Sequence, residues 1–182
     1  MPYTPLHYPL AYLIYKSCKR FRVKLNFPAV IIGSFIPDLE IPFFWLTTGS
    51  KTYDRLVFHS IFGGGTLGTF TASLLTIYVY PWLFSKIFGL KPNAEMFKFS
   101  FTLVFSALIG VLSHVFLDTL NHPYNPLLFP FSTQTVNIFL LFQNPFIASA
   151  LVNLTCLAGL IFIVVFEARK NPKSFWKTLL LG

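Results

Sequence analysis

Apolar residues dominate this chain of 182 residues in long runs that short polar or basic clusters separate. About 20 consecutive apolar residues are enough to cross a bilayer as a helix. The pattern predicts one all-α domain, residues 1–182, that is an integral membrane protein built as a bundle of about five transmembrane helices. The predicted helices cover residues 5–20, 27–47, 56–85, 99–121 and 146–168, and a short basic amphipathic tail, 169–182, follows.

Prolines and capping residues refine this pattern. Thr4-Pro5 has the form of an N-cap followed by proline at the first helical position. Pro37 interrupts the second predicted helix, and Pro81 is expected to kink or stop the third. Residues 123–145 combine several prolines with many apolar residues. This stretch therefore predicts an interfacial or re-entrant segment between the fourth and fifth helices.

The composition supports a membrane protein and argues against a soluble domain or a disulfide-rich protein. The chain is 54% hydrophobic and only 11% charged, whereas soluble domains are about 25% charged. Its two cysteines are too few for a disulfide framework. No basic stretch precedes the first apolar run, so no removable signal peptide is expected.

The distribution of the basic residues predicts how the chain is oriented in the membrane. Twelve of the 14 Lys and Arg residues fall in three clusters, at residues 16–24, 86–98 and 169–177. These clusters follow alternate helices, so they lie on one side of the membrane, which the positive-inside rule makes the cytoplasmic side. We expect a multi-pass inner (plasma) membrane protein with its N-terminus outside and its C-terminus in the cytoplasm. No nucleic-acid partner is expected, because the basic residues follow the helix ends.

Most of the remaining ionisable residues fall toward the opposite, outer side. His7, Asp38, His59, His114 and Asp118 share one predicted depth range. Charged groups in a membrane cost several kcal/mol unless they are paired, hydrated or bound to a cation. A metal ion would supply the missing positive charge. His114 and Asp118 stand at i and i+4, on one helical face, and mixed imidazole and carboxylate ligands suit zinc better than manganese or iron.

Other polar residues have open interpretations. His122 lies about 12 Å along an ideal helix from His114, which favours a second ion or a role in substrate binding. Glu40 points to another helical face than Asp38 and contacts either another helix or the groups around the ligands. His122 and Glu40 are therefore the candidate catalytic residues. Asp54 and Arg55 are expected to form a solvated loop pair.

Small residues suggest how the third helix packs. Ser60, Gly64 and Gly68 recur at every fourth position, just after His59. Such a ladder allows helices to approach closely in a membrane. No lysine follows these glycines as it does in a phosphate-binding loop, so we interpret the ladder as a packing motif.

Four motifs occur in a fixed order: Thr-Pro-Leu-His ending at His7, Gly-Ser-Phe-Ile-Pro-Asp ending at Asp38, Phe-His-Ser around His59, and Ser-His-Val-Phe-Leu-Asp from Ser113 to Asp118. Over about residues 1–125, the chain resembles small bacterial and archaeal membrane-bound metal-dependent hydrolases. These are similar in turn to the zinc-dependent phospholipase C and single-strand nuclease superfamily.

The resemblance implies a ligand set. Asp38, His59, His114 and Asp118 would hold one zinc ion, and His7 with a shared Asp118 would hold a second. The soluble relatives complete a third metal site with a later histidine, and this chain has no histidine after His122. We therefore expect one or two ions.

These inferences predict a metal-dependent hydrolase whose zinc-activated water attacks a lipid-like substrate at the outer membrane face. The location favours a lipid, and the resemblance alone implies a phosphoester. Membrane lipids are expected partners. Two alternatives remain open. One is a non-catalytic subunit of a larger membrane complex, with a structural metal or polar cluster. The other is a metal or proton transporter, although no polar path leads toward the cytoplasmic half.

Overall fold

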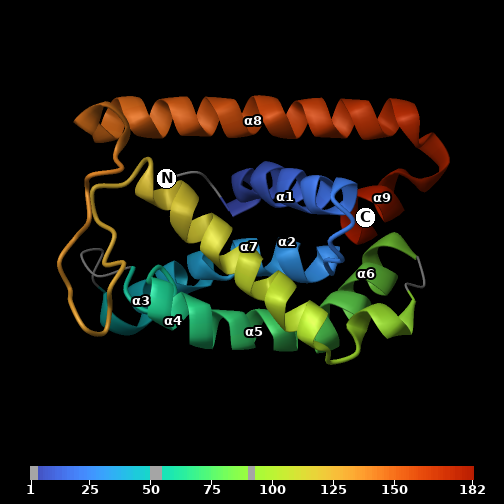
Figure 1. Cartoon of the computed structure of the whole chain (residues 1–182), viewed down its shortest axis with the longest axis horizontal. Coiled ribbons are helices and arrows are strands. Elements are labelled where there is room, and N and C mark those ends of the chain that lie inside the picture. Colours follow the sequence, from blue (N-terminus) through green and yellow to red (C-terminus); the bar gives the residue numbers. More distant parts are fainter. Residues whose placement is uncertain (1–3, 50–54, 90–92) are drawn as a thin grey trace.

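The computed structural model describes residues 4–49, 55–89 and 93–182. All regular structure within these ranges is helical. In Figure 1 one long helix, α8, lies along one side of the molecule, and the other helices pack beneath it. Helices α3 and α4 lie at one end of the bundle, and α6 and α9 lie at the other. The predicted all-α membrane fold is confirmed.

The helices follow the predicted order closely. The α-helices are α1 (Tyr8–Arg20), α2 (Phe27–Phe35), α3 (Glu40–Thr48), α4 (Ile61–Gly63), α5 (Thr69–Leu74), α6 (Tyr80–Phe88), α7 (Phe101–Thr119), α8 (Pro145–Lys170) and α9 (Phe175–Leu181). Short 3-10 turns are η1 (Thr4–His7), η2 (Pro37–Leu39), η5 (Ala94–Phe97), η6 (Leu141–Gln143) and η7 (Pro172–Ser174). Two π-helical stretches, η3 (Gly64–Gly68) and η4 (Leu75–Val79), join α4, α5 and α6 into one helix.

Four helices in the described residues are long and apolar enough to cross a membrane. They are Phe27–Thr47, Ile61–Phe88, Phe101–Thr119 and Pro145–Lys170. The first predicted helix forms as η1 and α1, but α1 has only 13 residues, fewer than the roughly 20 that a span needs. Its side chains attach it to α8, because Glu167 accepts a hydrogen bond from Tyr12 and lies 3.4 Å from the Lys16 Nζ.

The predicted start of the third helix was wrong. The helix begins at Ile61 and not at residue 56, because the Ser60 hydroxyl caps it by accepting a hydrogen bond from the Gly63 N–H at 2.9 Å. His59 therefore lies in the preceding turn. Pro81 does not stop the helix, which continues to Phe88. Pro81 directly follows the π-helical stretch η4, where the altered backbone register accommodates a residue without an N–H group.

The irregular segment and the tail both contact the bundle. Residues 123–140 contain no helix and form the loops at the α3 and α4 end in Figure 1, where the Ile61 N–H donates to the Leu127 carbonyl at 2.9 Å. The predicted location of residues 123–145 at or within the membrane interface stays a prediction. The tail folds back as α9, and the Tyr8 hydroxyl donates to the Leu179 carbonyl at 2.8 Å. The basic tail is therefore a packed helix.

Glycines bring α2 and α7 into direct backbone contact. A Cβ atom on Gly33 would lie 2.3 Å from the Ala107 carbonyl oxygen, and one on Gly110 would lie 2.3 Å from the Val30 carbonyl oxygen. Only hydrogen fits at either position. Since His114 follows Gly110 by about one helical turn, this crossing also fixes where His114 meets α2.

The small-residue ladder packs the third helix on α7, as predicted. Cβ atoms on Gly64 and Gly68 would lie 3.1 and 3.6 Å from the Val111 Cγ1 atom. The first member, Ser60, has the different role of capping the helix. The ladder therefore joins α7 to the turn that carries His59.

Candidate metal centre

The five predicted metal ligands meet inside the bundle. His7 comes from η1, Asp38 from η2, His59 from the turn before α4, and His114 and Asp118 from α7. None of these side chains is more than 6% exposed. The structure thus brings together residues that are up to 111 positions apart in the sequence.

Asp38, His59 and His114 surround one point, and Asp118 lies beside the two imidazoles. The His114 Nε2 atom lies 3.6 Å from both Asp38 Oδ1 and Asp118 Oδ2. The His59 Nε2 atom lies 3.6 Å from Asp118 Oδ2 and 4.0 Å from Asp38 Oδ1. Zinc bonds of about 2.0–2.2 Å place tetrahedral ligands about 3.3–3.6 Å apart. The donor atoms therefore fit a zinc-sized ion after a small contraction.

His7 contacts the same cluster from the other side of Asp118. Its ring stacks on His114 with centroids 3.7 Å apart, and its Nε2 atom lies 3.8 Å from Asp118 Oδ1. His7, His114 and Asp118 form one group of possible ligands, and Asp38, His59 and His114 form another. Both groups use His114, whose Nδ1 atom is occupied by a hydrogen bond to Ser34. His114 can therefore ligate only one ion, through Nε2.

Hydrogen bonds orient the imidazole rings. His114 Nδ1 lies 2.8 Å from the Ser34 carbonyl oxygen, and His59 Nδ1 lies 3.1 Å from Glu40 Oε2. Each acceptor favours a proton on Nδ1 and leaves the Nε2 lone pair directed toward Asp38 and Asp118. Ligating histidines in metalloproteins commonly have such partners. Burial lowers the pKa of His59, although its hydrogen bond to Glu40 acts in the opposite direction, and the neutral ring is the form that binds metal.

Glu40 is a positioning residue in this geometry. Besides His59, its carboxylate accepts hydrogen bonds from the backbone N–H groups of Leu56, Val57 and Phe58, at 3.0, 2.5 and 2.8 Å. These contacts hold the turn that carries His59. They also occupy the oxygens that a general base would need, so the contacts favour positioning over the predicted catalytic role.

His122 lies outside both groups of possible ligands. It is half-buried, and its Nε2 atom has no hydrogen-bond partner among the described residues. Burial and the nearby positive charge of Arg55 lower the pKa of His122 to about 3. The ring is therefore neutral, and its role toward a substrate stays a prediction.

Arg55 is the residue that sequence reasoning misplaced. Its predicted partner, Asp54, lies outside the described residues. Arg55 itself is 4% exposed, and its Nη1 atom donates to Asp118 Oδ2 at 2.9 Å. The prediction of a solvated side chain was wrong, because the pairing joins residues 63 positions apart. No local pattern signals such a contact.

Buried acidic side chains outnumber the buried guanidinium in this cluster. Asp38, Glu40 and Asp118 are buried carboxylates, and Arg55 is the buried guanidinium beside them. With neutral imidazoles, three negative charges face one positive charge. A divalent ion would neutralise the remaining two charges in a region where uncompensated charge is costly.

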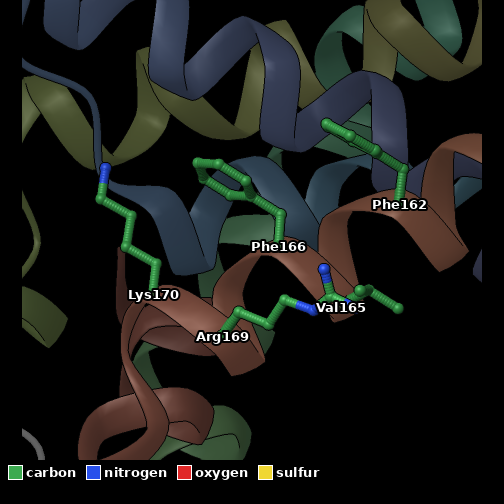
Figure 2. A pocket seen from close by; sticks show the side chains of 5 residues that line it. All are labelled: Phe162, Val165, Phe166, Arg169 and Lys170. Atoms are coloured by element: carbon green, nitrogen blue, oxygen red, sulfur yellow. The ribbon is translucent and has the colours of Figure 1, made fainter.

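Two cavities differ in their relation to this cluster. One of about 460 Å³ lies on α8 and is lined by Phe162, Val165, Phe166, Arg169 and Lys170 (Figure 2). None of these residues belongs to the cluster. The other, of about 390 Å³, is lined by Leu39, Glu40, Phe43, Phe44, Val57, Phe58 and Leu67. It borders the cluster at Glu40.

Comparison with known families gives one match. A family model described as YdjM inner membrane protein matches residues 7–181, which include all five predicted ligands. No curated protein and no solved structure matches the chain. The family description supports an inner-membrane location and does not itself describe a hydrolase.

Proposed function

The chain belongs to the YdjM inner membrane protein family, and from this premise we propose that it binds a divalent metal ion, zinc by preference, inside its helical bundle. One observation carries the proposal. Buried donor atoms that lack hydrogen-bond partners among the described residues converge on one point: His59 Nε2, His114 Nε2 and both Asp38 oxygens. Unpaired buried polar atoms are costly, and a metal ion would satisfy all of them.

The donor chemistry favours a transition metal. Asp38, His59 and His114 would form the ligand set, with Asp118 or His7 as the neighbouring candidate for a further ligand. Zinc accepts such mixed nitrogen and oxygen ligands at four positions. Manganese and iron also bind mixed sets, so they are the competing ions.

We further propose that the bound ion supports hydrolysis of a phosphoester in a lipid-like substrate. Zinc, when bound, lowers the pKa of water and polarises phosphoryl oxygens. The chain's own residues then have distinct roles. Glu40 and Ser34 hold the ligand rings in place, Arg55 offsets the charge of Asp118, and the Nε2 atom of His122 is available to bind the substrate. The reaction rests on the resemblance of the His and Asp motifs to membrane-bound metal-dependent hydrolases, and the apolar surroundings support a lipid.

Lipid hydrolysis is expected to depend on the metal ligands. Membrane lipid extracts incubated with the zinc-loaded wild-type protein should lose one phospholipid class and gain its hydrolysis products. The same extracts with His114→Ala should remain unchanged, because the ion would lose a nitrogen ligand. Thin-layer chromatography and mass spectrometry measure both. Identical lipid patterns for the two proteins, at full zinc occupancy of the wild type, would contradict the hydrolase proposal.

A second function deserves the same test. The ligands are almost completely buried, and a closed site is typical of structural zinc. This burial favours a non-catalytic membrane subunit of a larger complex. Metal bound without turnover on lipid, nucleotide and peptide panels would support the subunit over the hydrolase.

Orientation follows from the basic residues. The ends of α1, α6 and α8 lie with α9 at one end of the bundle in Figure 1, and the basic clusters lie on or beside these ends. We propose that this end faces the cytoplasm. A fluorescent protein that folds only in the cytoplasm should fluoresce when fused after Gly182. Activity of alkaline phosphatase, which folds only outside, at the same position would reverse the orientation.

A further inference from the structure

We infer that the apolar cavity bordering Glu40 holds an acyl chain of the substrate lipid, an inference that rests on the proposed function. The cavity has a volume of about 390 Å³, within the range of about 300–1,000 Å³ typical of small-molecule sites. Six of its seven lining residues are apolar: Leu39, Phe43, Phe44, Val57, Phe58 and Leu67. Such a lining selects hydrocarbon and offers nothing to a polar head group.

The position of the cavity identifies a lipid as the occupant. Its walls come from η2 and α3 on one side, and from the turn before α4 and from η3 on the other. Helices α3 and α4 lie side by side in Figure 1. Leu39, Phe43 and Leu67 are 51%, 62% and 57% exposed. They belong to the candidate spans Phe27–Thr47 and Ile61–Phe88. In a bilayer this opening faces lipid tails, so an acyl chain enters it directly.

The lining residues connect the cavity to the metal centre. Leu39 follows the predicted ligand Asp38, and Phe58 precedes the predicted ligand His59. Glu40 lines the cavity while its carboxylate binds His59 and three backbone N–H groups. An acyl chain in the cavity therefore lies against the two segments that carry the predicted ligands Asp38 and His59. Its head group would lie beside the metal centre.

Photolabelling tests this inference without relying on turnover. The full chain is placed in phosphatidylethanolamine vesicles containing a phospholipid with a diazirine at the end of one acyl chain. After irradiation, mass spectrometry of peptides should find label on residues 39–44 and 57–67 several-fold above that on the exposed face of α8. Leu67→Trp should abolish this excess by filling the cavity. Leu74→Trp is the matched control, because Leu74 is also exposed on the same span but does not line the cavity.

The outcomes separate this inference from the proposed function. Label spread evenly over the exposed apolar faces, or unchanged in Leu67→Trp, would overturn the acyl-chain site even if lipids are hydrolysed. Cross-links between two copies through residues 39–44 would overturn it in favour of a protein interface. Specific label that Leu67→Trp removes would support it, even if no hydrolysis is found. Zinc content measured on each variant shows that the metal centre is intact.

Discussion

Replacing Asp38 with asparagine or His114 with alanine is expected to reduce the zinc bound to the purified protein to near the background level. Wild-type protein prepared without chelators should carry close to one ion per chain. Asp38→Asn is the sharper change, because neither Asp38 oxygen has a hydrogen-bond partner among the described residues. The substitution removes a charged ligand and breaks no hydrogen bond of the Asp38 side chain among the described residues. Elemental analysis by plasma mass spectrometry measures the metal, and circular dichroism checks that the helices persist.

Two further variants calibrate this result. Glu40→Gln should retain some metal with weaker affinity, since loss of a ligand-orienting partner typically costs about 10–100-fold. His122→Ala should retain the full amount, because His122 belongs to neither group of possible ligands. Equal metal content in wild type, Asp38→Asn and His114→Ala would show that the buried cluster is not a metal centre.

Replacing Gly110 with alanine is expected to destabilise the bundle strongly. The added methyl group would meet the Val30 carbonyl oxygen at 2.3 Å, and a backbone atom cannot move aside as a flexible side chain can. Overpacking typically costs about 1–3 kcal/mol and occasionally more. Separation of α2 from α7 would also weaken the hydrogen bond between Ser34 and His114. Thermal unfolding in detergent, followed by circular dichroism, should show a clearly lower midpoint.

Gly65→Ala is the matched control for this prediction. A Cβ atom there would meet only the Leu108 Cδ1 atom, at 3.7 Å, which is an ordinary contact. Alanine also favours a helix over glycine by about 1 kcal/mol. The control should unfold at or above the wild-type midpoint. If Gly110→Ala matched it, the two backbones would have to be farther apart than the structure places them.

The helices and the membrane class follow from the sequence because both depend on local apolar runs. The gathering of His59, His114 and Asp118 also followed, since charge that is costly in a membrane must collect where it can be compensated. The depth of each residue in the membrane is enough to predict this gathering, whatever the packing of one helix against another.

The sequence pattern could not predict contacts between segments that are distant in the chain. Arg55 was assigned to its neighbour Asp54, but it reaches Asp118 across the bundle. Glu40 binds a turn that begins 16 residues later. The glycines at 33 and 110 are isolated in the sequence, and only the crossing of α2 and α7 explains them.

The contact between α9 and the first residue of α1 has a consequence for the order in which the candidate metal centre is assembled during synthesis. Tyr8, next to His7, donates its hydroxyl proton to the carbonyl of Leu179. Chains are made from the N-terminus at about 5–20 residues per second, so the other four predicted ligands emerge before this contact is possible. We therefore expect Asp38, His59, His114 and Asp118 to be able to gather before α9 has been made. The hydrogen bond between Tyr8 and Leu179, next to His7, can form only afterwards.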